Sequence, residues 1–145
     1  MKINVKKLCD AAVLPSRETV GAAGADLRTV ISEPLTIEPG TTAMLPTGLA
    51  FEIPEGYVGL VFARSSLGSK RGLAPANKVG VIDSDYRGEV KVALHNHSAV
   101  SQTVEPLERV AQFVVVPFLA AEYEEADELS DTVRGEGGFG STGRK

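Results

Sequence analysis

The sequence has little cysteine, no excess of positive charge and no long apolar run. Its single cysteine, Cys9, excludes an intramolecular disulfide and a zinc site built from several thiolates. We interpret Cys9 as a small apolar filler in a protein from a reducing compartment. The formal net charge of -4 argues against a surface that binds polymeric nucleic acid, because such surfaces are usually basic.

Long apolar segments are also missing. No stretch approaches the roughly 20 apolar residues that a membrane-spanning helix needs, and the opening MKINVKKLCD lacks the apolar core of a signal peptide. We therefore expect a soluble intracellular protein, in the cytoplasm or the nucleus, without a targeting segment or a membrane partner. The length of 145 residues fits one ordinary domain that buries its own core.

Helix-forming segments are scarce as well. Residues 31–63 contain four prolines and four glycines in 33 positions, which excludes a long helix there. GEVKVALHN places Val90, Val92 and Leu94 on one face, the alternation of a half-buried strand. RVAQFVVVPFL is a denser run of β-branched residues, which predicts a strand covered on both sides.

One short helix is expected at RSSLGSK, where Ser65 or Ser66 could be the N-cap and Gly68 would end the helix. The remaining pattern of short apolar bursts separated by turns predicts an all-β protein, a sandwich or jelly roll.

Residues 134–145, RGEGGFGSTGRK, differ from the rest of the chain because five of the twelve are glycine. Such a segment is hard to hold in a fixed strand or helix, so we expect a mobile C-terminal arm beyond a single domain, 1–133. Simple disorder is one interpretation. The other is that its N–H groups, hydroxyls and cations wrap a phosphate chain while Phe139 stacks on a flat partner such as a base.

Five segments occur in an informative order. They are AGADLRT (23–29), ARSSLGSKRG (63–72), NKVGVIDSDYRGEV (77–90), ERVAQFVVVP (108–117) and RGEGGFGSTG (134–143). In order and spacing they resemble the five motifs of the trimeric dUTPase family, from about residue 22 to the end of the chain. The following expectations about assembly, reaction and residue roles come from this resemblance.

The resemblance implies a jelly-roll-like β barrel that assembles as a homotrimer, with active sites shared between subunits and the arm closing over them. It implies Mg²⁺-dependent hydrolysis of dUTP to dUMP and pyrophosphate, the reaction of a dUTP diphosphatase, which lowers dUTP and supplies dUMP for thymidylate synthesis. The expected partner is therefore a small nucleotide.

Asp83 matches the carboxylate that activates the attacking water, and general bases are needed because water is a poor nucleophile at neutral pH. A turn aspartate that caps the hairpin is the structural alternative. Asp85 fits turn architecture better. The resemblance implies contacts with uracil and deoxyribose from four residues: Asn77, Val81, Tyr86 and Phe139. An ordinary core tyrosine and a turn asparagine are the alternatives for Tyr86 and Asn77.

The resemblance implies that seven residues bind the phosphates: Arg64, Ser65, Ser66, Gln112, Arg134, Ser141 and Thr142. Asp26 matches an acidic position near the metal, where its contact would be indirect, although a salt bridge to an arginine explains it equally well. Magnesium would be held mainly by the triphosphate and water, since the sequence contains no dense carboxylate cage.

Two positions depart from the family pattern. Ser66 and Leu107 stand where many relatives have glycine. Two other functions remain open: a related dCTP deaminase, which shares the barrel, and a non-catalytic nucleotide-sensing or protein-binding trimer.

Overall fold

Short strands separated by proline and glycine turns dominate the computed structural model, which describes residues 1–138. The strands are β1 (Asn4–Lys7), β2 (Ala25–Arg28), β3 (Leu35–Ile37), β4 (Thr42–Pro46), β5 (Leu49–Glu52), β6 (Tyr57–Phe62), β7 (Leu73–Pro75), β8 (Gly80–Ile82), β9 (Lys91–Asn96), β10 (Gln102–Val104) and β11 (Arg109–Pro117). The all-β prediction is confirmed, including the absence of a long helix from residues 31–63.

The strands form antiparallel sheets. The larger two have the orders β2-β11-β6-β8 and β4-β9-β7, and β1-β5 and β10-β3 form two-stranded pairs. Within the described part of the chain these ladders do not close into one continuous ring. The architecture is jelly-roll-like, with antiparallel sheets enclosing a common core.

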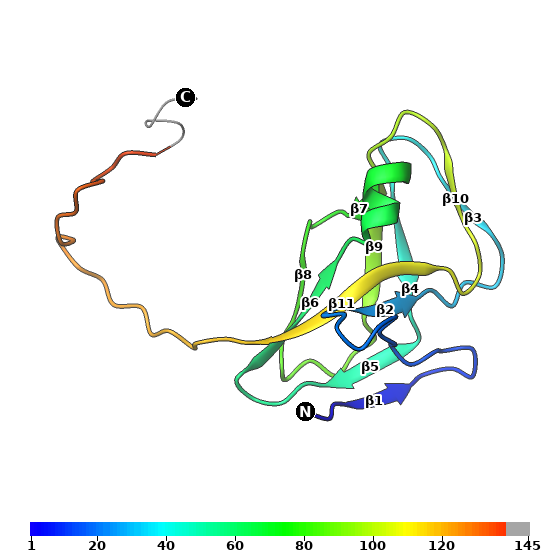
Figure 1. Ribbon diagram of the computed structural model, residues 1–145, viewed down its shortest axis with the longest axis horizontal. Coiled ribbons are helices and arrows are strands. Elements are labelled where there is room, and N and C mark those ends of the chain that lie inside the picture. The colour runs from blue at the N-terminus through cyan, green and yellow to red at the C-terminus, as the bar shows by residue number, and fades with distance from the viewer. Residues whose placement is uncertain (139–145) are drawn as a thin grey trace.

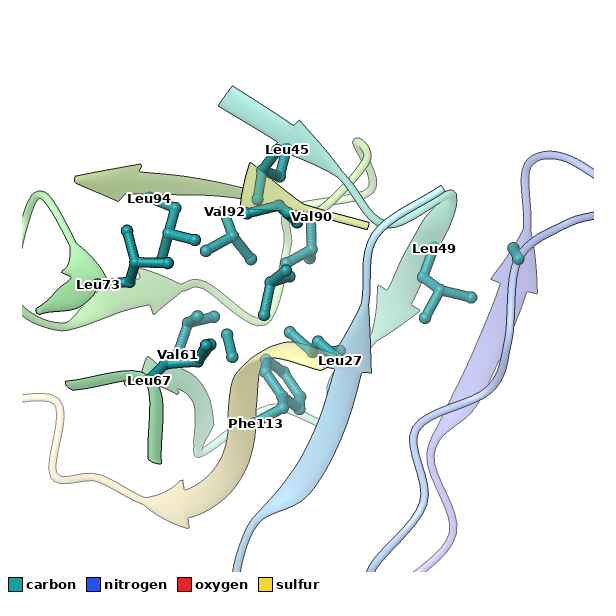
Figure 2. Packing of buried hydrophobic residues seen from close by; sticks show 14 of the residues in the cluster. Leu27, Leu45, Leu49, Val61, Leu67, Leu73, Val90, Val92, Leu94 and Phe113 are labelled. Carbon is teal, nitrogen blue, oxygen red and sulfur yellow. The ribbon is translucent and has the colours of Figure 1, made fainter. Parts of the chain in front are cut away.

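The core lies between the two larger sheets (Figure 2). The predicted alternation in β9 is confirmed, because Val92 and Leu94, together with Val90 just before the strand, are all buried. Across from them, Phe113 of β11 stacks on Phe51 with ring centroids 4.7 Å apart. Residues 114–116 of β11 are only partly buried, so the coverage expected on both sides is incomplete at that end.

The helix found within residues 1–138 begins near the predicted N-cap and ends later than predicted. It is the π-helix η1, Leu67–Arg71, and Ser66 occupies the N-cap position without a capping side-chain hydrogen bond. Gly68 lies inside the helix, so the expectation that it ends the helix is wrong. The helix ends at Gly72, whose φ of 65° is the left-handed conformation that glycine adopts without a steric cost.

The prediction for Cys9 is also wrong, because this residue is exposed and does not belong to the core. It follows β1, where the chain turns and the residues from Leu8 to Ala11 are all exposed. The turn after β1 has no buried space for a side chain to fill. The apolar character of Cys9 therefore does not indicate whether this residue is buried.

After β11 the chain leaves the body of the protein as an extended arm (Figure 1). Side chains 118–136 are exposed. Phe139, Ser141 and Thr142 lie outside the described residues. No helix in the described range is both long and apolar enough to cross a membrane.

Candidate active site

A slot separates β8 from β9. β8 pairs with β6 along one edge, whereas β9 belongs to the other large sheet, and between them lies a cavity of about 200 Å³. Asn77, Gly80 and Val81 line it on one side and Val92 on the other. A Cβ atom on Gly80 would stand 3.1 Å from Cβ of Val61 and 3.5 Å from Nδ2 of Asn77, so the missing side chain keeps the slot open.

The turn that follows β8 borders a second hollow of about 430 Å³, lined by Val81, Asp83 and Tyr86 among others. Tyr86 is 45% exposed, so it is not a core tyrosine. Its hydroxyl donates a hydrogen bond to the carbonyl of Glu89 at 3.0 Å. Its ring lies against Gly88, where a Cβ would meet the Tyr86 hydroxyl oxygen at 2.4 Å. The ring is therefore held at the mouth of the hollow.

Asp83 is exposed on the border between this hollow and a larger groove that reaches Phe118 at the start of the arm. Its backbone carbonyl accepts a hydrogen bond from the N–H of Tyr86 at 3.2 Å. Among the described residues, the Asp83 carboxylate makes no hydrogen bond, so it does not cap the turn. The side chain is available to a water molecule.

A network of ion pairs occupies a different part of the surface. Asp26 of β2 accepts hydrogen bonds from Nε of Arg64 at 2.8 Å and from Nη1 of Arg109 at 3.1 Å. Arg109 also pairs with Glu18. The salt bridge proposed for Asp26 is thus present, with two arginines. Each carboxylate oxygen of Asp26 thus has one arginine partner.

A small pocket of about 160 Å³ lies next to this network, lined by Glu18, Ala22, Gly24, Asp26, Arg64, Ser65 and Gln112. Gln112 donates from Nε2 to the carbonyl of Ala63 at 2.8 Å, which gives the amide in this apolar strand a partner. A Cβ on Gly24 would lie 2.4 Å from Oε1 of Gln112, so glycine leaves room for this amide. Ser66 does not line the pocket.

The structure therefore gathers the proposed residues into two groups. Asn77, Val81, Asp83 and Tyr86 lie around the hollows beside β8, and Asp26, Arg64, Ser65 and Gln112 line the small pocket; below we call these groups the proposed nucleoside half and the proposed phosphate half. Arg134 belongs to neither, because it lies in the arm, where its Nε donates to the carbonyl of Gly137 at 2.7 Å. Within residues 1–138, no three His, Cys, Asp or Glu side chains gather closely enough to hold a metal ion.

Sequence reasoning missed Arg109 and Glu18. Arg109 lies within ERVAQFVVVP, but its partners are 83 and 91 residues away in the sequence. The only available signal was a charged residue opening an apolar strand, which does not identify the partner.

Comparison with known proteins agrees with this geometry. The family model described as dUTPase matches residues 10–143. The chain belongs to the dUTPase family. The deoxyuridine 5'-triphosphate nucleotidohydrolase of Ralstonia pickettii is 47% identical over 99% of both chains. That of Alcanivorax borkumensis is 47% identical over 96% of this chain and 93% of its own.

Solved dUTPases have the same fold. The dUTPase of Staphylococcus bacteriophage 80alpha, as a mutant with the dUTP analogue dUpNHpp, superposes with a TM-score of 0.89 at 31% identity and covers 98% of both chains. A mutant dUTPase from phage phi11 of S. aureus gives a TM-score of 0.77 at 27% identity, covering 88% of this chain and 98% of its own. Its description concerns the coordination of a structural Mg(II) ion.

Proposed function

We propose that this dUTPase hydrolyses dUTP to dUMP and pyrophosphate by means of a water molecule activated by Asp83. The relatives named as deoxyuridine triphosphate nucleotidohydrolases support the substrate and the reaction. The observation that carries the mechanism is the exposed Asp83 carboxylate, without a hydrogen-bond partner among the described residues, beside a slot of base size.

Uracil enters the slot between β8 and β9. Asn77 offers an amide there, and β8, an edge strand that pairs only with β6, offers backbone N–H and C=O groups along its other edge. Cytosine has its donor and acceptor exchanged at the same edge, so it would leave some of these groups unmatched. Val81, which is 60% exposed, supplies an apolar contact at the mouth of the slot.

The ring of Tyr86 supports the deoxyribose and leaves no space for a 2′-hydroxyl. Its hydrogen bond to Glu89 and its packing on Gly88 support this role, because a ring that could rotate away would not exclude ribose. Asp83 lies three residues before Tyr86 in the same turn, close to where the sugar joins the α-phosphate. A general base must be within one water molecule of the reacting phosphorus, and Asp83 satisfies this requirement in such a pose.

Arg64, Ser65, Ser66 and Gln112 bind the phosphates. Arg64 is already oriented by Asp26, and a guanidinium held in place matches phosphate oxygens with parallel hydrogen bonds. Mg²⁺ bound to the triphosphate would neutralise charge on the phosphates. Asp26 would contact the waters around this ion, since the arginines occupy both of its oxygens.

The two halves of the site lie at opposite ends of β6. Ile82, next to Asp83, pairs with Gly59, whereas Gln112 pairs with Phe62, the last residue of the strand before Arg64. The residues from Val58, opposite Asp83, to Arg64 correspond to about 20 Å of extended chain. One chain therefore cannot bring its own Asp83 and Arg64 to the same triphosphate. This separation supports a homotrimer in which each active site combines halves from two subunits.

The arm completes the site. We assign residues 1–133 to the β domain and 134–145 to a lid that orders over the nucleotide, with Arg134, Ser141 and Thr142 on the phosphates and Phe139 on the uracil. The extended course of residues 118–138, away from the body of its own chain, supports a reach toward another subunit (Figure 1). Deleting 134–145 should lower kcat/KM by about 100-fold or more while the melting temperature stays within a few degrees.

The function is tested by incubating the purified full-length protein and Mg²⁺ with dUTP, dCTP, dTTP and UTP and measuring pyrophosphate and ammonia. We expect pyrophosphate from dUTP alone at a substantial rate. Ammonia from dCTP would instead identify a deaminase, and no product from any nucleotide would identify a binding protein. A kcat/KM for UTP equal to that for dUTP would contradict the role of Tyr86.

A further inference from the structure

Arg64 and Ser65 leave the sheet at the end of β6 and lead directly into η1. The last ladder pair before them is Phe62 with Gln112, so the ladder fixes Arg64 and Ser65 at one end only. Besides the ion pair of Arg64 with Asp26, the position of this segment depends on what fixes the far end of η1.

Arg71, the last residue of η1, provides that attachment. Its Nε donates to Oε1 of Gln102 at 3.1 Å and its Nη1 to Oε1 of Glu108 at 2.5 Å. Its Nη2 donates to the carbonyl of Thr103. All three guanidinium nitrogens are thus engaged, by β10 and by the turn before β11. Such a planar fork fixes orientation in a way that a single ammonium cannot.

Glu108 extends the attachment toward the ion pairs of the site. While Oε1 accepts from Arg71, Oε2 accepts from the backbone N–H of Glu105 at 2.9 Å, so the side chain closes its own turn. The next residue is Arg109, which contacts Asp26, and Asp26 in turn holds Arg64. Arg71 is thus linked to Arg64 through Glu108, the adjacent Arg109 and Asp26.

The ion pair between Arg71 and Glu108 is partly buried. The Arg71 and Glu108 side chains are only 27% and 23% exposed, so solvent screens their interaction less than that of most surface pairs. Lys70, the neighbouring cation in the same turn of η1, is exposed. It provides a matched control in charge and position.

We propose that Arg71 is a positioning residue for the phosphate half, holding η1 against the turn before β11 so that Arg64 and Ser65 face the triphosphate. The proposal rests on the proposed function, because it assumes that a nucleoside triphosphate binds there. It requires that losing Arg71 weakens binding of the β- and γ-phosphates selectively, whereas a purely structural residue would affect stability alone.

The test compares Arg71→Ala, Arg71→Lys, Glu108→Gln and Lys70→Ala in the full-length protein. Calorimetric Kd values for dUpNHpp and dUMP with Mg²⁺ are measured beside melting temperatures. We expect Arg71→Ala to weaken dUpNHpp binding about tenfold and to change dUMP binding less than about twofold, because a small misplacement of binding groups is costly. Arg71→Lys and Glu108→Gln, which keep the fold more easily, should show a smaller selective loss, and Lys70→Ala should match the wild type.

Guanidinium ion adds a readout that a structural role would not move. Millimolar guanidinium should restore part of the dUpNHpp affinity that Arg71→Ala loses, and it should leave the affinity of Lys70→Ala unchanged. Equal affinity loss for both nucleotides, or a lower melting temperature with unchanged affinities in all the folded Arg71 and Glu108 variants, would overturn the proposal. Failure of the wild type to hydrolyse dUTP would instead contradict the proposed function, so the two failures are distinguishable.

Discussion

The two halves of the proposed site are built by different means. In the phosphate half, the charged side chains are partly buried and tied together, as Asp26 is by Arg64 and Arg109. In the nucleoside half, Val81 and Tyr86 are exposed, and the turn is held by local backbone contacts such as the Tyr86–Glu89 hydrogen bond. The difference indicates that charges are oriented by neighbouring charges, whereas shape selection depends on the path of the backbone.

This difference has a physical basis. A flexible arginine loses side-chain entropy when it binds an anion, and an ion pair that already fixes it reduces that cost. A base slot gains selectivity from groups that cannot move, and backbone N–H and C=O groups in a strand are the least mobile donors and acceptors available. Mutations in the two halves should therefore give different binding patterns.

The largest expected effect comes from Asp83→Asn. The amide keeps the shape of the carboxylate and cannot take a proton from water, so kcat should fall by about 100-fold or more while dUpNHpp affinity stays within a few-fold. Steady-state kinetics and calorimetry measure the two quantities.

Asp85→Asn is the matched control, since Asp85 is an exposed carboxylate two residues away in the same turn. Its kcat should remain within about threefold of the wild type. Near-normal turnover by Asp83→Asn would remove Asp83 as the base.

A pair of glycine substitutions separates the two halves. A Cβ at Gly24 would displace Oε1 of Gln112, only 2.4 Å away, so Gly24→Ala should weaken dUpNHpp about tenfold and dUMP much less. A Cβ at Gly80 would narrow the slot against Val61, so Gly80→Ala should weaken both nucleotides by similar factors.

Gly21→Ala controls for the loss of backbone freedom, because nothing lies within 4 Å of a Cβ at that position. Its affinities for both nucleotides should equal those of the wild type. If Gly24→Ala and Gly80→Ala gave the same pattern, the division into two halves would be wrong.

The smallest expected effect concerns Leu107, which has a φ of 60° in the turn before β11. A left-handed conformation costs an L-residue about 1–2 kcal/mol, and glycine avoids this cost. Glycine in turn lowers the free energy of unfolding by about 0.5–1 kcal/mol, because it has greater freedom in the unfolded chain. Leu107→Gly should therefore raise the free energy of unfolding by up to about 1 kcal/mol without changing kcat.

Urea denaturation measures this change. Leu107→Ala keeps the Cβ and the strain, so it should not stabilise the protein. Equal stabilisation by both variants would show that the leucine side chain, and not the backbone conformation, is unfavourable.

Local patterns predicted much of the fold. The alternation of Val90, Val92 and Leu94 is a property of one strand, and its period identifies both the strand and its buried face. The end of η1 was misplaced because glycine is tolerated inside a helix as well as at its end. Only the backbone conformation distinguishes Gly68 from Gly72.

The site was predictable in its motifs and not in its contacts. From the resemblance, Arg64 and Asp26 are predicted to be neighbours of the phosphates, and the salt bridge of Asp26 to arginine was one of two alternatives. That Arg109 shares Asp26, and that Glu18 joins from another loop, depends on chain segments brought together only by the complete fold. Local sequence carries no signal for such pairings.

The placement of Asp83 and Arg64 at opposite ends of β6 has a genetic consequence. In the proposed trimer, each functional unit belongs to an interface, so two defective alleles can compensate for each other. Chains carrying Asp83→Asn keep an intact phosphate half, and chains carrying Arg64→Ala keep an intact nucleoside half. When both are made in one cell in equal amounts, random assembly unites the two intact halves at roughly a quarter of the interfaces. A cell that carries both defective alleles would therefore retain more activity than a cell that carries either allele alone.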